Sequence, residues 1–203
     1  MKIICCGRNY AEHAKEMKHD IPDKPVIFMK PDTALKRKNM PFFLPDFSNE
    51  VHYETEIVLR ICKNGKNIEE KFAGKYFDQL TVGIDFTARD LQSEAKKKGW
   101  PWEISKAFDN SACVGEFLPV SKFPDLYNIN FCMYKNKQLI QKGNTKDVLF
   151  SFEKIISYAS QFFTLLEGDF VFTGTPVGVG PVIKDDHIEC FIENDSLLEF
   201  DVK

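Results

Sequence analysis

The segment that decides the fold spans residues 54–61 and reads ETEIVLRI. A short segment that ends in an aliphatic run before the turn at Asn64-Gly65 is typical of a strand. Alternate residues of a strand point to the same face, so we expect Glu54 and Glu56 to lie together on one face. The other face carries residues 55, 57, 59 and 61 and is mainly apolar. The segment therefore predicts a strand with two carboxylates on one side.

Similar short apolar segments predict strands along the rest of the chain, and helices are few. The other expected strands cover residues 2–6, 26–29, 80–86, 129–134, 138–142, 169–173, 187–193 and 197–202. The expected helices cover residues 10–18, 88–98 and 151–165. The dipeptide Asn136-Lys137 between two of the strands predicts a hairpin. This pattern favours a strand-rich α+β fold, a sandwich or a roll, over a doubly wound fold.

The helix expected at residues 88–98 carries signals at both ends. Thr87 occupies the N-cap position and Asp90 follows three residues later, which resembles a capping box. The lysine run 96–98 falls in the last turn, where positive charge suits the helix dipole. Gly99 is a natural residue to follow the last turn. We therefore expect this helix to be well defined at both ends.

The composition is that of an ordinary globular chain of 203 residues with a formal net charge of -3. That length fits a single domain. The near-neutral charge argues against a nucleic-acid-binding protein, which is usually basic. No apolar run approaches the roughly 18 residues of a membrane span, and the apolar stretch near the N-terminus is too short for a signal peptide. We therefore expect a cytoplasmic protein with neither a nucleic-acid partner nor a membrane partner.

The cysteines indicate neither a metal ribbon nor a disulfide framework. The six are Cys5, Cys6, Cys62, Cys113, Cys132 and Cys190, and none of them forms a C-x-x-C motif. Zinc ribbons and thioredoxin-like sites need that spacing. A chain of this length without an export signal does not depend on disulfides. We therefore expect reduced thiols, most of them buried.

Three acidic residues at strand positions form a candidate metal site. Glu54 and Glu56 share a strand face, and Asp85 lies near the end of the apolar strand at 80–86. Close carboxylates repel each other unless they are solvated or bind a cation, and an all-oxygen site suits Mg²⁺ or Mn²⁺. Alternatively, the glutamates lie on a surface strand and Asp85 faces the next helix N-terminus. His52, on the same face as Glu54, is either a further ligand or a structural histidine.

His13 and Glu16 form a candidate proton-transfer pair. They lie three residues apart in the helix expected at 10–18, for which Asn9 is the N-cap candidate, so both side chains share one helix face. A carboxylate beside an imidazole sets its tautomer and raises its basicity, as a general base requires. The same spacing is common on solvated helices, which is the alternative interpretation. His19 has no comparable partner and is interpreted as a surface residue.

Residues 173–181 form a glycine-rich loop that reads TGTPVGVGP. The Gly-Lys-Ser/Thr of a Walker A loop is missing. Pro181 leads into a further strand instead of the helix that a dinucleotide-binding fingerprint needs. The backbone N–H groups of the loop and the Thr175 hydroxyl can receive an anionic oxygen. A plain turn between strands is the alternative.

The sequence also resembles the fumarylacetoacetate hydrolase family, through motifs that occur in order from Gly7 to about Asp186. These motifs are GRNYAxH (7–13), FMKP (28–31), HYETE (52–56), GIDxTARDLQ (83–92), KKGWPW (97–102), SKAFD (105–109) and GDxxxTGTPxGVG (168–180). The short chain and the pair of His13 and Glu16 resemble the branch of acylpyruvases and oxaloacetate decarboxylases.

The resemblance implies a mixed β-sheet roll with a few short helices. Residues 1–203 would form one catalytic domain, usually a homodimer, with a lid helix at about residues 8–20. The resemblance implies Mg²⁺ held by Glu54, Glu56 and Asp85, with Mn²⁺ able to substitute. It also implies catalytic roles for His13, Glu16, Lys106 and Gln92, and substrate binding by Arg8, Arg89 and Thr175.

The activity expected from the resemblance is metal-dependent hydrolysis of a C–C bond in an acylpyruvate or a related 2-oxo acid, through a pyruvate enolate. One alternative at the same site is decarboxylation or tautomerisation of oxaloacetate, or isomerisation of an unsaturated 2-oxo diacid. A non-catalytic 2-oxoacid-binding relative is the second alternative. In each case the expected partner is a small 2-oxoacid.

Overall fold

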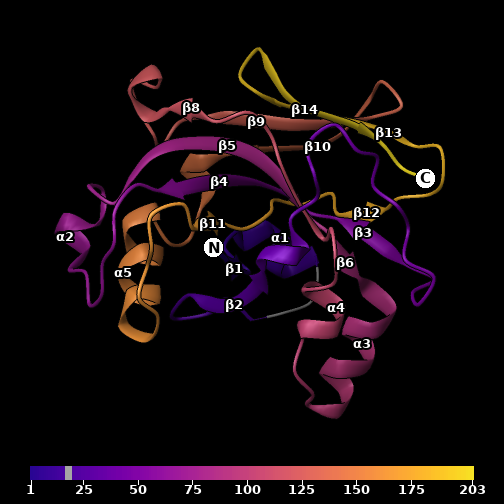
Figure 1. Ribbon diagram of the computed structural model, residues 1–203, viewed down its shortest axis with the longest axis horizontal. Helices are drawn as coiled ribbons and strands as arrows, with labels where there is room; N and C mark the ends of the chain where they lie inside the picture. Colours follow the sequence, from indigo (N-terminus) through magenta and orange to yellow (C-terminus); the bar gives the residue numbers. More distant parts are fainter. Residues whose placement is uncertain (17–19) are drawn as a thin grey trace.

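The computed structural model describes residues 1–16 and 20–203 (Figure 1). The strands are β1 (Lys2–Gly7), β2 (Val26–Pro31), β3 (Val51–Tyr53), β4 (Thr55–Ile61), β5 (Phe77–Asp85), β6 (Thr87–Ala88), β7 (Ala112–Val114), β8 (Leu118–Pro119), β9 (Asn130–Lys135), β10 (Gln138–Asn144), β11 (Phe170–Phe172), β12 (Gly180–Pro181), β13 (His187–Ile192) and β14 (Asp195–Asp201). The helices are α1 (Ala11–Glu16), α2 (Glu70–Ala73), α3 (Arg89–Lys98), α4 (Glu103–Lys106) and α5 (Phe152–Phe162), with 3-10 turns η1 (Asp32–Ala34), η2 (Val120–Lys122) and η3 (Thr145–Asp147). The part of the expected lid helix at 17–19, which includes His19, lies outside the described residues.

The strands form three sheets, and the largest carries the carboxylates of interest. Its order is β2-β1-β11-β4-β5-β7, and β8 also pairs with β5. β1 runs parallel to β11, whereas the other pairs of this sheet are antiparallel, so the sheet is mixed. A four-stranded sheet has the order β10-β9-β13-β14, and β12, β3 and β6 form a small third sheet. This strand-rich architecture with few helices confirms the predicted fold class.

The main core lies between the two larger sheets. Figure 1 shows β9, β13 and β14 above the curved strands β4 and β5. Ile57 and Leu80 of the large sheet share one apolar cluster with Met133 of the four-stranded sheet. On the opposite side of the large sheet, Val58 packs in a second apolar cluster with Phe172. β4 is therefore buried on both faces, which rules out the surface strand that had been an alternative for this segment.

The start of α3 differs from the prediction, and its end agrees with it. The N-cap residue is Ala88, whose side chain makes no capping hydrogen bond. Thr87 lies in β6 because the chain there pairs with His52 of β3. Gly99 has a φ of 69° and closes the helix as predicted, since glycine meets no Cβ clash in the left-handed region.

The side chain of Asn9 bonds to distant backbone groups and, among the described residues, does not cap α1. Its amide nitrogen donates to Phe150 O at 3.1 Å and to Thr173 O at 2.8 Å, and its oxygen accepts from Phe150 N at 2.7 Å. The buried amide therefore joins the end of β1 to two distant segments. Those segments precede α5 and follow β11, so Asn9 stabilises the tertiary structure around the glycine-rich loop.

The predicted hairpin is present between β9 and β10. Asn136 and Lys137 have φ values of 52° and 65°, as a two-residue turn of the primed type requires. The amphipathic helix expected at 151–165 is α5, which ends at Phe162 and whose first turn is capped by the Ser151 hydroxyl. Among the described residues, no helix is long and apolar enough to cross a membrane.

Candidate active site

Three carboxylates meet where β4 and β5 run side by side. Glu54 lies between β3 and β4, Glu56 lies in β4, and Asp85 ends β5. The antiparallel register places Glu56 opposite Gly83, and the backbone N–H of Asp85 donates a 2.9 Å hydrogen bond to Glu54 O. One oxygen of each carboxylate lies within 4.8 Å of the others, and all three residues are buried. Strand pairing therefore brings together the three predicted metal ligands.

Burial and like charge make this group costly without a cation. Burial raises the pKa of Glu56 well above its ordinary value, and the negative charges of Asp85 and Glu54 raise it further. The N–H of Gly174, 2.7 Å from Glu56 Oε2, offsets this only in part. Burial also acts to raise the pKa of Glu54, but Lys106 and Arg89 outweigh it and hold that pKa below its usual range. A bound divalent cation would relieve the repulsion.

Lys106 and Arg89 hold the carboxylates in place. Lys106 Nζ lies 2.9 Å from Glu54 Oε2 and 2.7 Å from Asp85 Oδ2. Burial acts to lower the pKa of Lys106, but Asp85 and Glu54 raise it above its ordinary value. Arg89 Nη2 lies 2.6 Å from Glu54 Oε1, and its Nη1 donates to Gln92 Oε1 at 2.7 Å. Both side chains therefore lie where they can offset the charge of an anionic substrate.

Lys30 supports Asp85 from β2, and sequence reasoning gave it no role. Its Nζ lies 2.7 Å from Asp85 Oδ1 and donates hydrogen bonds to Ser111 Oγ at 2.9 Å and to the backbone carbonyl oxygen of Lys106. Among the described residues Asp85 Oδ1 accepts no hydrogen bond, and the ion pair with Lys30 is its polar contact. A carboxylate oxygen has more than one lone pair, so this oxygen can still bind a metal ion.

The donor set fits a hard divalent cation, because Mg²⁺ and Mn²⁺ prefer oxygen ligands. His52 is not part of this set. Its Nε2 lies 2.9 Å from Glu50 Oε1, and its Nδ1 accepts a 3.4 Å hydrogen bond from Arg89 Nε. Burial and the charge of Arg89 lower the pKa of His52. We therefore assign His52 as a structural histidine that helps to orient Arg89.

His13 and Glu16 contact each other, as their helix spacing predicts. His13 Nδ1 lies 3.0 Å from Glu16 Oε2, and His13 is only 7% exposed, which excludes a solvated position. Glu16 Oε1 also accepts a 3.2 Å hydrogen bond from the backbone N–H of Gly178. The glycine-rich loop therefore does bind anionic oxygens, as its sequence allows, but they belong to the protein: Glu16 at Gly178 and Glu56 at Gly174.

A cavity of about 40 Å³ is lined by both His13 and Glu54. The predicted site residues on its wall are Arg8, His13, Glu54, Arg89, Gln92 and Lys106, and the wall also includes Gly7, Phe28, Lys96 and Trp102. Thr175 is not among these described lining residues, and its hydroxyl accepts a 2.8 Å hydrogen bond from Gln141 Nε2. By this measure a single water needs roughly 10–15 Å³, so the cavity has room for a few waters.

Thr87 and Lys96 belong to the site, although sequence reasoning assigned both to the ends of a helix. The Thr87 hydroxyl donates to Glu54 Oε1 at 3.1 Å and accepts from Lys106 Nζ at 2.7 Å. Lys96 faces the cavity, whereas its neighbours Lys97 and Lys98 are exposed. The helical spacing from Arg89 is the signal that could have distinguished Lys96 from the other two lysines.

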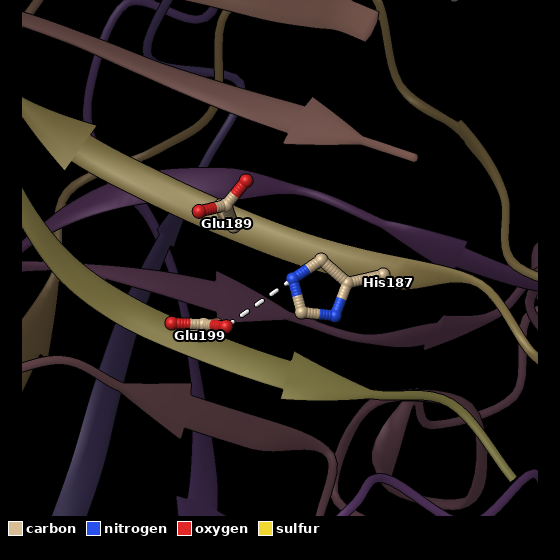
Figure 2. Close-up of side chains that lie close together, drawn as sticks. All are labelled: His187, Glu189 and Glu199. Atoms are coloured by element: carbon tan, nitrogen blue, oxygen red, sulfur yellow. Dashed lines mark ion pairs between the residues drawn. The ribbon is translucent and has the colours of Figure 1, made fainter. Parts of the chain in front are cut away.

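A second group of possible metal ligands lies on the exposed face of β13 and β14. Figure 2 shows His187, Glu189 and Glu199 projecting from these neighbouring strands. His187 Nε2 lies 3.3 Å from Glu199 Oε1, and its Nδ1 lies 2.8 Å from Asp201 Oδ1, so both ring nitrogens have carboxylate partners. The group borders a cavity of about 880 Å³ whose described lining contains none of the predicted site residues. The active site is therefore assigned to the smaller cavity, where the buried charges need compensation.

The fold and the site define a class of protein: a strand-rich α+β domain with a buried acidic centre beside a lysine and a histidine–glutamate pair. Residues 2–203 match the family described as fumarylacetoacetate (FAA) hydrolase C-terminal, and the chain belongs to this family. The resemblance found in the sequence motifs is therefore confirmed over nearly the whole chain.

The relatives place the chain among enzymes of this superfamily. It is similar to the mitochondrial oxaloacetate tautomerase of Mus musculus, with 41% identity over 201 residues, which cover 99% of this chain and 91% of the relative. It is also similar to the mitochondrial oxaloacetate decarboxylase of Dictyostelium discoideum, with 40% identity over 203 residues. This match covers 99% of this chain and 93% of the relative. Among solved structures, the chain is similar to the fumarylpyruvate hydrolase of Pseudomonas aeruginosa in complex with Mn²⁺ and pyruvate, with a TM-score of 0.93 and 35% identity. This match covers 100% of this chain and 89% of the solved chain.

Proposed function

We propose that this protein is a metal-dependent enzyme that acts on oxaloacetate, as a tautomerase or a decarboxylase. The observation that carries the proposal is the buried group of Glu54, Glu56 and Asp85, together with a small cavity that Glu54 and His13 both line. Two relatives that match nearly the whole chain are named for oxaloacetate reactions. They favour this alternative over acylpyruvate hydrolysis, which was the main expectation from the sequence.

Glu54, Glu56 and Asp85 would hold the metal ion, which we propose to be Mg²⁺ with Mn²⁺ able to replace it. The Mn²⁺ in the Pseudomonas aeruginosa structure supports this choice. When bound, such an ion acts as a Lewis acid that stabilises negative charge on a 2-oxo acid and its enolate. Asp85 Oδ1, which accepts no hydrogen bond from the described residues, and the raised pKa of Glu56 agree with a site built for a cation.

The protein side chains control charge and the movement of one proton. Lys106 and Arg89 offset the negative charge that a dianionic substrate adds, and the Gln92 amide can donate a hydrogen bond to a substrate oxygen. In tautomerisation the keto form loses a proton at C3 and gains one at the C2 oxygen, and His13 is the group placed to accept and return it. In decarboxylation the C–C bond electrons stay on C3, which then takes up a proton. Glu16 sets the His13 tautomer for both steps.

Hydrolysis of an acylpyruvate is the second candidate. A buried and oriented His13 favours it, because the imidazole can deprotonate a water that attacks the distal carbonyl. The Pseudomonas aeruginosa neighbour is named a fumarylpyruvate hydrolase. Isomerisation of an unsaturated 2-oxo diacid needs the proton transfer that His13 would carry out in tautomerisation. A non-catalytic 2-oxoacid-binding protein would need no proton transfer.

The deciding experiment compares oxaloacetate and acetylpyruvate, each with Mg²⁺ and with EDTA. Loss of the enol absorbance follows tautomerisation, and pyruvate release follows decarboxylation and hydrolysis, after the spontaneous and free-metal rates are subtracted. Metal-dependent turnover that is faster with oxaloacetate supports the proposal. Faster turnover of acetylpyruvate makes the protein an acylpyruvase, and no turnover of either substrate rejects both candidates.

The variant His13→Ala separates the two candidate reactions. It should abolish hydrolysis, which needs an activated water, and should reduce decarboxylation less, because no water attacks in that reaction. Full hydrolysis by this variant would refute the role of His13 in water activation.

A further inference from the structure

Lys96 differs from the rest of its lysine run in the helix face on which it lies. Arg89, Gln92 and Lys96 occupy positions i, i+3 and i+7 of α3, which share one face of a helix. All three line the active-site cavity. Lys97 and Lys98 are exposed, and Lys98 pairs with Glu94 along the helix. α3 therefore presents one lysine of the run to the substrate.

Aromatic side chains shape the part of the cavity next to Lys96. Lys96 Nζ lies 5.6 Å from the ring centroid of Trp102, and the Trp102 ring packs against Phe28 with centroids 6.1 Å apart. Arg8, which follows the last paired residues of β1, lines the same cavity. A ligand group in this part of the cavity would thus lie between aromatic surfaces and two cationic side chains. Such walls exclude water and strengthen charge interactions.

The charges on the wall favour an anionic ligand. Four cationic side chains line the cavity, and Glu54 is the one carboxylate among the described lining residues. Arg89 and Lys106 also contact the carboxylate group. Burial, and then the positive charge of Arg89, lower the pKa of Lys96 to about 8, and Glu54 opposes this only in part. Arg89 therefore adds positive potential around Lys96, and an anion bound there gains electrostatic stabilisation.

We propose that Lys96, together with Arg8, binds the second carboxylate of a dianionic 2-oxo acid and so selects diacids over monoacids. This inference rests on the proposed function, because it takes the first carboxylate and the 2-oxo group to face Glu54, Glu56 and Asp85. The far carboxylate of a four-carbon diacid then needs a cation other than Lys106. A monoacid offers Lys96 no negative charge, which is the source of discrimination.

The test compares a diacid with its monoester in three proteins: wild type, Lys96→Gln and Lys97→Gln. The probes are L-malate, which has no 2-oxo group and therefore neither tautomerises nor decarboxylates, and its 4-methyl ester. Their dissociation constants are measured by calorimetry with Mg²⁺ present, and oxaloacetate turnover is measured in parallel. Lys97→Gln removes the same charge at the next position, on an exposed side chain, so it controls for net charge and for helix stability.

We expect Lys96→Gln to weaken binding of the diacid about tenfold or more, as loss of a charge-assisted hydrogen bond does, and binding of the ester less than about twofold. Lys97→Gln should behave like wild type. Equal weakening of both probes by Lys96→Gln overturns the inference, as does a wild type that binds the ester as tightly as the diacid. If wild type binds the diacid through Lys96 but does not turn over oxaloacetate, the proposed function fails and the carboxylate subsite stands.

Discussion

Glu16 Oε1 accepts a 3.2 Å hydrogen bond from the backbone N–H of Gly178, so the first helix and the glycine-rich loop meet beside the active-site cavity. The other oxygen of the same carboxylate lies 3.0 Å from His13 Nδ1. One carboxylate therefore connects the loop to the imidazole and restricts the orientation of both. Because of this contact, the His13 imidazole is held in one orientation, as a general base requires.

The role of Glu16 can be tested by Glu16→Gln. The glutamine can still accept from Gly178, but it removes the charge that stabilises a protonated imidazole, so we expect kcat to fall about tenfold to a hundredfold with little change in KM. The measurement is steady-state turnover of oxaloacetate with Mg²⁺. Glu12→Gln makes the same charge change in the same helix and should leave kcat within about twofold. An equal loss of kcat in both variants would contradict the positioning role.

Metal binding should depend on Glu56 and not on the second group of possible ligands, which is formed by His187, Glu189 and Glu199 on β13 and β14. Glu56→Gln should weaken Mn²⁺ binding about a hundredfold or more, because a hard cation loses a charged oxygen ligand. The metal-free variant should be at least as stable as wild type, since a buried carboxylate crowded by like charges is replaced by a neutral amide. Glu189→Gln is the matched control. If calorimetry showed the tight site to be lost in Glu189→Gln instead, our assignment of the metal site would be wrong.

Lys30 should be essential for folding stability. Lys30→Met removes a fully buried cation that contacts Asp85 Oδ1 and several backbone oxygens, so we expect a loss of about 3–5 kcal/mol in the free energy of unfolding. Urea denaturation of the metal-free protein measures it. Lys38→Met breaks the exposed pair with Glu116 and should leave the unfolding midpoint close to that of wild type. Similar midpoints for the two variants would disprove the structural importance of Lys30.

The backbone at Gly174 should tolerate no side chain. Gly174 has a φ of 102°, and a Cβ there would lie 2.6 Å from Asn9 Cβ. Gly168 has a φ of 88°, but a Cβ added to it would meet no described residue within 4 Å apart from its chain neighbours. Gly174→Ala should therefore cost about 2–4 kcal/mol, and Gly168→Ala, which bears only the backbone strain, about 1 kcal/mol. Thermal unfolding of both variants provides the comparison. Gly174→Ala should also weaken Mn²⁺ binding, because the Gly174 N–H holds Glu56.

The thiols should be largely unreactive in the folded protein. All six cysteines are free: Cys5, Cys6, Cys113 and Cys190 are buried, and Cys62 and Cys132 are partly exposed. Burial raises the pKa of Cys113 to about 12, and the thiolate is the form that reacts. At pH 8 we expect at most two thiols to react rapidly with Ellman's reagent, and all six after denaturation. Rapid reaction of four or more thiols in the native protein would show that the core opens readily.

Local patterns predicted much of the architecture. The strand around Glu56, the hairpin at Asn136-Lys137 and the helix end at Gly99 all appear where the sequence places them. Each depends on side-chain alternation or on backbone conformations that a few adjacent residues determine. The N-cap prediction for Thr87 was wrong because pairing of β6 with β3 overrode a local signal. The Thr87 hydroxyl instead donates a hydrogen bond to Glu54 and accepts one from Lys106.

By itself, the sequence determined that Glu54 and Glu56 share a face and that His13 and Glu16 can touch, because backbone geometry relates residues two or three positions apart. Only the tertiary structure decided that Asp85 joins the glutamates, that Lys30 reaches it from another strand, and that Lys96 faces the cavity. These contacts follow from the pairing of β4 with β5 and from the packing of α3 against α4, β3 and β6. Such pairings depend on burying apolar surface from distant parts of the chain, and no local pattern encodes that.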